Sequence, residues 1–593
     1  MKFFPIIRSL MLIYPFISTT PFYAEITRDL DLNAIFTTIN YTQSNQGGYA
    51  LRSLLAQPIT DLTILEGRKE IISHFAQNAT LSGKLTTLLK AFANKENDFE
   101  RMLQPVSDIE NAAFQEFYFS NSYLREWNYS PLHLELGQIA YLGNLCSSMA
   151  QHALAFAIFT WGLDEEHVCP SHPAKDHTDK HKNHSHKHKH KEDGHTHNDK
   201  CNHNHAHDDA SISSIKKLFK SKEFKYGFQL WHGIAQLQEL YSIQAIVRNN
   251  MKCIKELQTH LMGIARGIRI INHIHATLKN YPEITIHLAH YNDLENISTS
   301  TNVSEKLTLL LKLLNSHTFK GQPSVFSRIG VILAAYKVIQ EIGHELQPAL
   351  MAIGEIDAYL SCAYLFNSTQ LSTARYSFAH YTTISSTPVI HAHNFWHPLM
   401  CSNAIQLNSI DLGLNDAPRN ILLTGPNACG KSTNLKAVTL CAYLAQTITL
   451  VPAQEYHQTL CKEIYSSIVV SDNIQKNKSL FVAELTDAED LLNRVENLGT
   501  GEYMLIVLDE LFTSTHHEKG QSVAYQLLEY LYASPHVITI VATHFDNLSA
   551  LADIPANNCT NYTLNNFKLV PGIGLHDNSF DIVKKQTKSR LLI

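Results

Sequence analysis

The chain has 593 residues, of which 44% are hydrophobic and 17% are charged, and its formal net charge is −6. This length exceeds what one hydrophobic core usually supports, so we expect several domains. The slightly acidic balance excludes a generally basic protein that coats nucleic acid, and a DNA-binding role would need a local basic surface. The 10 cysteines, scattered along the chain, favour a reducing compartment over a disulfide framework.

Residues 1–24 have features of a secretory signal peptide. Lys2 and Arg8 precede the apolar run SLMLIYPFIS, and Ala24 offers a small residue for cleavage. The bulky Phe22 and the interruption by Pro15 argue against cleavage, so the segment is either a signal peptide or a hydrophobic N-terminus. Beyond it, no run of about 18 apolar residues predicts a membrane span.

Residues 30–366 are predicted to form a mainly α-helical domain. A helical pattern of apolar residues from Leu51 ends at Pro58, and Asp61 stands where it would cap the next helix. From Ile215 to Lys279 the chain contains no proline, which predicts long packed helices that act as levers. Two apolar stripes on these helices are predicted to be core: Trp231, Ile234, Leu237, Tyr241 and Ala245, and then Ile254, Leu257, Leu261, Ile264 and Ile268.

A histidine-rich insertion interrupts this domain at residues 167–209. It has no apolar period, so it cannot bury a core and is predicted to be disordered. Imidazoles at alternate positions could bind Zn²⁺ or Ni²⁺, with His184, His186, His188 and His190 as the candidate ligands. The alternative is a solvated, low-complexity segment whose metal affinity is incidental.

From about residue 385 to 593, short apolar strands alternate with helices. This rhythm predicts an α/β domain with a mainly parallel sheet covered on both faces. The run ILLTGPNACGKST joins an apolar strand to a complete phosphate-binding loop, G-x-x-x-x-G-K-[ST], which opens the next helix. The loop residues are Gly425, Pro426, Asn427, Ala428, Cys429, Gly430, Lys431, Ser432 and Thr433.

This loop predicts the binding of a nucleoside triphosphate. Its backbone N–H groups and the N-terminus of the following helix attract phosphate, Lys431 reaches the β- and γ-phosphates, and Ser432 binds Mg²⁺. The strand in MLIVLDE carries Asp509 to the Mg²⁺ and Glu510 to the attacking water. The strand in VITIVATH carries His544 to the same edge, next to the γ-phosphate. We therefore expect Mg²⁺-dependent ATP hydrolysis, with Glu510, His544 and Lys431 as the catalytic residues.

The order of these motifs is typical of the ABC-type branch of phosphate-loop ATPases, but the LSGGQ-like signature of transporter ATPases does not occur. The chain instead resembles the MutS family. The resemblance covers about residues 30 to 585. It is carried in the ATPase domain by TGPNACGKST, Val451-Pro452-Ala453, the S-x-F-x-x-E pattern from Ser479 to Glu484, Asp509-Glu510 and Ala542-Thr543-His544, and in the helical domain by Thr42, Gly48, Leu55, Pro58, Asp61, Arg68 and Glu355-Ile356-Asp357.

The resemblance implies a homodimer that hydrolyses ATP and closes on DNA, either duplex, mismatched or branched. It implies that Ser479 contacts, in trans, the γ-phosphate bound to the partner subunit. It also implies mismatch repair or a related recognition of DNA structure, in the cytoplasm unless residues 1–24 export the protein. Because the resemblance begins directly with the core domain, the mismatch-reading and connector domains are expected to be missing.

The chain also departs from the family pattern. Cys429 and Asn477 replace glycines, Ile405 stands where the family stacks an aromatic ring on adenine, and the loop after Glu510 lacks the usual glycines. Together with the expected lack of a mismatch-reading domain, these departures favour recognition of DNA shape or junctions over the reading of mismatched bases. Two alternatives stay open: a non-DNA ABC-type ATPase that moves a protein or envelope partner, with a link to metal handling, and a nucleotide-binding scaffold without turnover.

Overall fold

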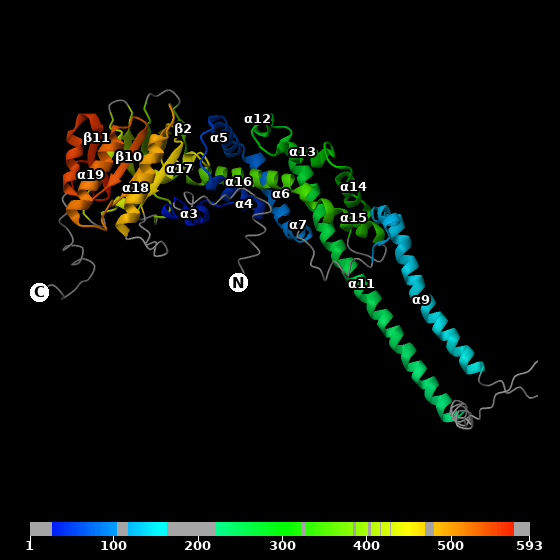
Figure 1. Cartoon of the computed structure of the whole chain (residues 1–593). Helices are drawn as coiled ribbons and strands as arrows, with labels where there is room; N and C mark the ends of the chain where they lie inside the picture. The colour runs from blue at the N-terminus through cyan, green and yellow to red at the C-terminus, as the bar shows by residue number, and fades with distance from the viewer. Residues whose placement is uncertain are drawn as a thin grey trace, which may run out of the picture. The chain divides into compact units, whose positions relative to one another are not determined.

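The computed structural model describes residues 26–103, 117–162, 221–321, 328–382, 387–400, 405–414, 417–426, 429–468 and 480–574. The chain is mainly helical up to residue 369 and forms an α/β sheet domain after it, as the sequence predicts (Figure 1). It divides into two compact units. The first contains Met1–Pro105, His260–Phe319 and Val338–Ile593, and the second contains Val106–Thr259 and Lys320–Lys337. The domain boundaries given above stay predictions.

The helices of the first unit that precede the sheets are short to medium in length. They are α3 (Leu32–Ile39), α4 (Asn45–Ala56), α5 (Leu62–Gln77), α6 (Ala79–Ala93), α7 (Glu96–Leu103), α12 (Pro282–Thr285), α13 (Tyr291–Thr299), α14 (Glu305–Leu314) and α16 (Gln347–Thr369). Helix α4 ends before Pro58, and the Asp61 side chain caps α5 by accepting hydrogen bonds from the Thr63 and Ile64 amides. Both local predictions are confirmed.

Two buried carboxylates fix the N-terminus of α4. Asp357 of α16 accepts hydrogen bonds from the backbone N–H of Ser44 (2.8 Å) and from its hydroxyl (2.6 Å), while Glu96 accepts from the amides of Asn45 and Gln46. A Cβ on Gly47 would lie only 2.7 Å from the Cβ of Asp357, so glycine is required for this close approach. Residues more than 300 positions apart thus join α4 to α16.

Helix α11 (Lys222–Leu278) confirms that the proline-free stretch is helical, as one long helix instead of several, and α9 (Pro131–Gly162) is a second long helix outside that stretch. The lever role stays a prediction. Helix α11 is 57 residues long, and its second apolar stripe, from Ile254 to Ile268, is buried. The prediction that the first stripe is core was wrong. Trp231 is 64% exposed and Tyr241 is 74% exposed, because no neighbour in the described part of the chain covers this face. Helical spacing records which residues share a face, but not whether another element packs on it.

One helical stretch is both long and apolar. Helix α15 (Ile329–Ile342) and α16 form the run Ile329–Thr369, which is long and apolar enough to cross a membrane by length and composition. In its most apolar window, 78% of the residues are buried inside the protein, as is usual for a core helix. Only the described residues enter this finding.

Six strands form the central sheet, in the spatial order β12-β11-β5-β10-β9-β8. The strands from β11 to β8 are parallel to one another, and β12 pairs antiparallel with β11 at the edge. Their bounds are β5 (Asn420–Thr424), β8 (Glu463–Ser467), β9 (Met504–Asp509), β10 (Val537–Ala542), β11 (Cys559–Asn565) and β12 (Lys568–Pro571). The predicted parallel sheet is therefore confirmed for this part.

The earlier strands of the α/β region form separate, smaller sheets that the sequence did not distinguish. A four-stranded sheet has the order β2-β7-β3-β4, and β1 pairs with β6. The bounds are β1 (Ser377–Phe378), β2 (His380–Tyr381), β3 (Ile390–Phe395), β4 (Asn408–Leu412), β6 (Leu450–Val451) and β7 (Glu455–Gln458). Strands β3 and β4 are antiparallel, and β3 and β4 supply one wall of the cavity described below.

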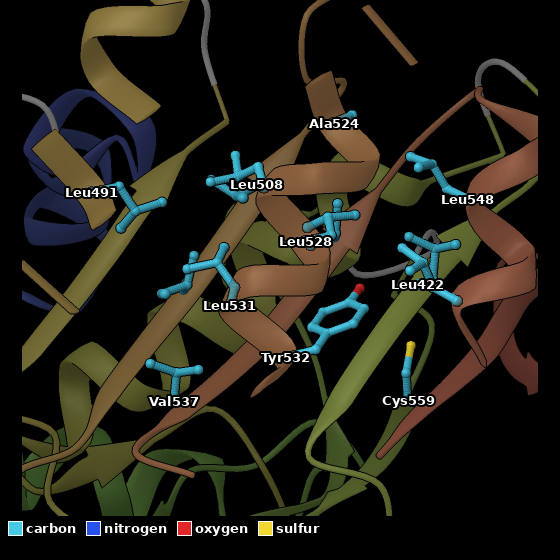
Figure 2. Packing of buried hydrophobic residues seen from close by; sticks show 14 of the residues in the cluster. Leu422, Leu491, Leu508, Ala524, Leu528, Leu531, Tyr532, Val537, Leu548 and Cys559 are labelled. Atoms are coloured by element: carbon cyan, nitrogen blue, oxygen red, sulfur yellow. The ribbon is translucent and has the colours of Figure 1, made fainter. Parts of the chain in front are cut away.

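Helices pack on both faces of the central sheet. One face is covered by α18 (Leu480–Glu496) and α19 (His517–Ala533), and Figure 2 shows Leu528, Leu531 and Tyr532 of α19 lying over the strands. Helix α17 (Lys431–Ala445) packs against β8, β9 and β10 and supplies no residue to that cluster, so it covers the other face. Strands buried on both faces need apolar side chains at every position, which explains the continuous runs MLIV and VITIV.

The C-terminal end of α17 is hydrogen-bonded to the helical part of the same unit. The Tyr443 hydroxyl donates to the Leu55 carbonyl (2.8 Å), and the Ile59 amide donates to the Gln446 carbonyl (2.9 Å). The Arg68 guanidinium donates to the Thr447 carbonyl. The helix that begins at the phosphate loop therefore ends against α4 and α5, so it connects the phosphate loop physically to these two helices.

Candidate active site

Three strand ends bring the predicted site residues together. In the sheet, β10 lies between β5 and β9, and all three run parallel, so their carboxyl ends share one edge. The Glu510 amide continues the ladder by donating to the Ala542 carbonyl (3.0 Å), and the Thr543 amide donates to the Leu423 carbonyl (3.1 Å). Ligands of open α/β sheets bind at this edge.

The described part of the phosphate loop has the backbone that such a loop needs. Gly425 has φ 146° and Gly430 has φ 100°, values that side chains other than glycine rarely adopt. Helix α17 starts directly after Gly430, and no side chain of the described residues caps it. Its first N–H groups are therefore available to an anion.

Lys431 and His544 lie in contact. The Lys431 ammonium donates to the carbonyls of Gly425 (3.0 Å) and Pro426 (3.2 Å), and its Nζ lies 3.4 Å from the His544 Nε2. The same His544 Nε2 is 2.7 Å from a Glu510 carboxylate oxygen. An ammonium, an imidazole and a carboxylate thus form one chain of polar contacts around the sheet edge.

Asp509, like Lys431, is a buried member of the site. Burial raises the pKa of its carboxyl, and the neighbouring Glu510 charge adds to this effect, while a hydrogen bond from the Ser432 side chain and the positive charge of Lys431 act in the opposite direction. Its Oδ1 is buried and has no hydrogen-bond partner among the described residues. A buried carboxylate oxygen without a donor, next to a serine hydroxyl, fits the oxygen ligands that Mg²⁺ prefers.

Glu510 adopts an uncommon backbone conformation. Its φ is 55°, and Phe512 two residues later has φ 54°. Side chains other than glycine pay a conformational cost in this left-handed region, and such positions concentrate at functional sites. The conformation directs Glu510 away from the buried strand and toward a cavity of about 440 Å³.

This cavity extends from the phosphate loop to strands β3 and β4 of the four-stranded sheet. Its lining residues are Phe395, Trp396, His397, Met400, Ile405, Gln406, Asn408, Gly430, Lys431, Ser432, Thr433, Asn434, Ala437, Glu510 and Phe567. Ile405 therefore lies in the wall beside the phosphate loop, where the sequence comparison with the family suggested a contact to the base. The volume is within the usual range for a small-molecule site.

Two family models match the chain. The model for MutS domain V matches residues 421–573, which include the phosphate loop, Asp509-Glu510 and His544, and the model for MutS domain III matches residues 22–221. The chain belongs to the MutS family. The resemblance stated from the sequence motifs is thereby confirmed.

Individual MutS proteins are similar over part of the chain. The chain is 35% identical to the DNA mismatch repair protein MutS of Synechococcus sp. (strain JA-2-3B'a(2-13)) over 150 residues, 25% of this chain and 16% of that protein. It is 30% identical to the human MutS protein homolog 4 over 204 residues, 32% of this chain and 21% of that protein. A match to MutS of Bartonella tribocorum is longer, with 24% identity over 327 residues, 54% of this chain and 34% of that protein. The chain thus covers a minor part of the length of these relatives.

Some predicted residues of this MutS-family chain lie outside the described residues. They are Asn427 and Ala428 of the phosphate loop, Ser479, and the four histidines His184, His186, His188 and His190. Residues 1–24 lie outside as well, so the choice between a signal peptide and a hydrophobic N-terminus stays open. Within the described ranges, no group of three or more His, Cys, Asp or Glu side chains could hold a metal ion.

Sequence reasoning missed one side of the cavity. Asn408, Asn434 and Phe567 lie at the phosphate loop, although they come from β4, α17 and the β11–β12 turn. The only sequence signal near Phe567 was a short polar interruption, Asn565-Asn566, between two strand-like runs. It predicts a turn, but not that the turn reaches the loop.

Proposed function

We propose that this MutS-family chain is a Mg²⁺-dependent ATPase of the phosphate-loop, ABC type that acts on DNA as a homodimer, in mismatch repair or a related recognition of DNA structure. The sequence similarity to MutS proteins favours this function over a non-DNA ATPase that moves a protein or envelope partner. Because the chain covers a minor part of those relatives, the DNA substrate, whether duplex, mismatched or branched, belongs to the proposal.

The contacts of Lys431 support its role in nucleotide binding. Its ammonium donates hydrogen bonds to two carbonyls of its own loop, Gly425 and Pro426. An incoming triphosphate offers charged oxygens to the same donor, and a charge-assisted hydrogen bond is stronger than one to a neutral carbonyl. Lys431 then exchanges loop carbonyls for the β- and γ-phosphates, and the N-terminus of α17 faces the same anion.

Ser432 and Asp509 are the residues that would hold Mg²⁺. The Asp509 Oδ1, which has no hydrogen-bond partner among the described residues, and the Ser432 hydroxyl are neighbouring oxygen atoms that can serve as metal ligands. The bound cation would neutralise negative charge that develops on the phosphates. A cation beside the Asp509 Oδ1 would favour the ionised carboxylate and so oppose the effect of burial, which raises the pKa of this carboxyl.

Glu510 and His544 would carry the hydrolytic step. The Glu510 carboxylate accepts a proton from, or orients, the water that attacks the γ-phosphorus, and the imidazole of His544 donates to a γ-phosphate oxygen. The His544 Nε2 and a Glu510 carboxylate oxygen lie within hydrogen-bonding distance, 2.7 Å apart. A γ-phosphate that draws His544 away therefore also frees Glu510 for the water.

Coupling to DNA would pass through α17. The contacts of Tyr443, Gln446 and Thr447 with Leu55, Ile59 and Arg68 connect the end of this helix to α4 and α5 of the core. A shift of α17 on nucleotide binding therefore displaces or strains those helices, which is how small motions at a nucleotide site are usually amplified. Ser479, in trans, would complete the site of the partner subunit.

The observation that carries the proposal is the contact of Lys431 with His544 and of His544 with Glu510 at one sheet edge. The test is steady-state ATP hydrolysis by the full chain, with and without linear, mismatched and branched duplexes. We expect Mg²⁺-dependent turnover that at least one DNA changes and that Lys431→Ala abolishes. Absent turnover, or turnover that Lys431→Ala leaves intact, contradicts the proposal. Turnover that no DNA changes would support the ATPase activity and contradict the action on DNA.

A further inference from the structure

A second, smaller cavity also borders Glu510. Its volume is about 100 Å³, and Glu510 lines both this cavity and the larger one beside the phosphate loop. Asp509 lines the small cavity as well, and so do Ser466 and Ser467 at the end of β8. The residue proposed to orient the attacking water therefore stands between the nucleotide cavity and a second polar space.

Arg28 and Asp29 reach this small cavity from the other end of the chain. They precede α3, at the start of the helical part of the same unit, and both line the cavity. Asp29 is 1% exposed, and its Oδ2 accepts hydrogen bonds from the Ser466 hydroxyl (3.1 Å) and the Ile468 amide (2.9 Å). These bonds attach the segment to the end of β8, beside β9, so a buried neighbour fixes the position of Arg28.

Negative side chains outnumber positive ones around the small cavity. The carboxylates in its lining are Asp29, Glu484, Asp487, Asp509 and Glu510. Among the described lining residues, Arg28 is the cation. Burial raises the pKa of the Glu484 carboxyl and the Asp487 charge adds to this effect, while a hydrogen bond from the Ser514 side chain opposes it. A guanidinium in the same space favours the ionised form of its carboxylate neighbours.

The Arg28 guanidinium is paired with the buried Asp29 carboxylate. Its Nη2 lies 3.5 Å from the Asp29 Oδ1, and 45% of the Arg28 side chain is exposed. One such pair engages one nitrogen of a planar group whose five N–H donors can serve several acceptors. On the other side, the Glu510 Oε1 is the oxygen that lies 2.7 Å from His544. The second oxygen of Glu510 is therefore the acceptor that Arg28 can engage, directly or through a water molecule.

We propose that Arg28 is a positioning residue for hydrolysis: its guanidinium, anchored by Asp29, holds the Glu510 carboxylate in place for the attacking water. The inference rests on the proposed ATPase function and adds a residue from the helical part of the chain to the same site. A general base must be ionised and within reach of its proton, and arginine keeps its charge over the whole physiological pH range. Lys431 lines the larger cavity, so the two cations have separate tasks.

The test is steady-state ATP hydrolysis by the full chain carrying Arg28→Ala. We expect kcat to fall about tenfold or more, with the KM for ATP within about twofold of the wild type, because nucleotide binding uses the other cavity. Guanidinium chloride at low concentration should restore part of the lost kcat, whereas sodium chloride at the same ionic strength should not. Arg28→Lys, which keeps the positive charge, should lose less than Arg28→Ala. Arg52→Ala is the matched control, because the Arg52 guanidinium lies over the Phe36 ring (3.9 Å), and it should leave both constants within about twofold.

Three results would overturn the inference. The first is an unchanged kcat in Arg28→Ala. The second is a rise in KM with kcat unchanged, because Arg28 would then serve nucleotide binding. The third is a loss of kcat that neither guanidinium nor Arg28→Lys reduces, because the side chain would then act through packing and not through its charge. A wild type without ATP turnover, or turnover that survives Lys431→Ala, is a different result: the proposed function itself then fails, and the role of Arg28 falls with it.

Discussion

The strands at the candidate active site and the long helix α11 both have apolar residues at the spacing that their secondary structure requires, yet they differ in what covers them. Strands β9 and β10 are buried at every position. The apolar stripe of α11 is buried from Ile254 onward, but Trp231 and Leu237, nearer the start of the helix, are 64% and 68% exposed. The period of a sequence thus sets the type of element, while burial depends on a second element packing against it.

The largest expected effect is a loss of ATP binding. It tests whether the edge of the sheet at the phosphate loop binds nucleotide or serves only the fold. Lys431→Ala should remove detectable ATP binding, because the Lys431 ammonium lies at the phosphate loop, on the Gly425 and Pro426 carbonyls, and is the proposed cation for the β- and γ-phosphates. Equilibrium titration with ATP measures this. Lys462→Ala is the control, since Lys462 is exposed and pairs with Glu502 at the surface. If the Lys431 variant bound ATP as tightly as the wild type, the strand edge at the phosphate loop would not be the ATP site.

Two matched leucine substitutions test the difference in burial along helix α11. Leu261→Ala should lower the free energy of unfolding by about 2–5 kcal/mol, because Leu261 is fully buried. Leu237→Ala, on the exposed part of the same helix, should change it by no more than about 0.5 kcal/mol. Urea denaturation followed by circular dichroism measures both. A comparable loss in Leu237→Ala would mean that the exposed stripe is covered in solution.

The smallest expected effect concerns stability within the active site. Asp509→Asn should raise the free energy of unfolding of the nucleotide-free protein at neutral pH by about 1 kcal/mol, while it impairs Mg²⁺-dependent hydrolysis. The reason is that burial raises the pKa of the Asp509 carboxyl, so the ionised folded state is disfavoured relative to the unfolded chain. Urea denaturation at neutral pH, without nucleotide or Mg²⁺, provides the measurement.

The same change has a defined pH dependence. A carboxyl with a raised pKa in the folded protein takes up its proton on folding as the pH falls below that value, so folding becomes more favourable in acid. The advantage of Asp509→Asn should therefore be fully present at neutral pH and shrink as the pH falls through the raised pKa. A variant that is less stable than the wild type at neutral pH would show that Asp509 is stabilised by its neighbours.

Local sequence patterns were sufficient to predict the site residues that stand immediately after an apolar strand. The phosphate loop, Asp509, Glu510 and His544 each come immediately after an apolar run, so their meeting at one edge follows from parallel pairing. The Asp61 cap and the end of α4 before Pro58 were also predictable, because they depend on neighbours in the chain. These features need no knowledge of distant contacts.

Long-range pairing decided the rest. The positions of β3 and β4 in a separate sheet, and the hydrogen bond from the Asn408 side chain to the Phe567 carbonyl, depend on pairing between segments up to about 160 residues apart. Asp357 likewise meets Ser44 across more than 300 residues. No local period contains such partners, and the same limitation led to the wrong prediction that the stripe from Trp231 to Tyr241 is core.

The central claim is that ATP held at this strand edge brings two copies of the chain together. Sedimentation velocity of Glu510→Gln with saturating ATP and Mg²⁺ tests it most directly, because loss of this carboxylate should slow hydrolysis by about 100-fold or more without preventing binding. We predict that the variant sediments as a stable dimer with ATP and reverts toward monomer when ADP replaces ATP. A Glu510→Gln protein that binds ATP and remains monomeric would contradict the account.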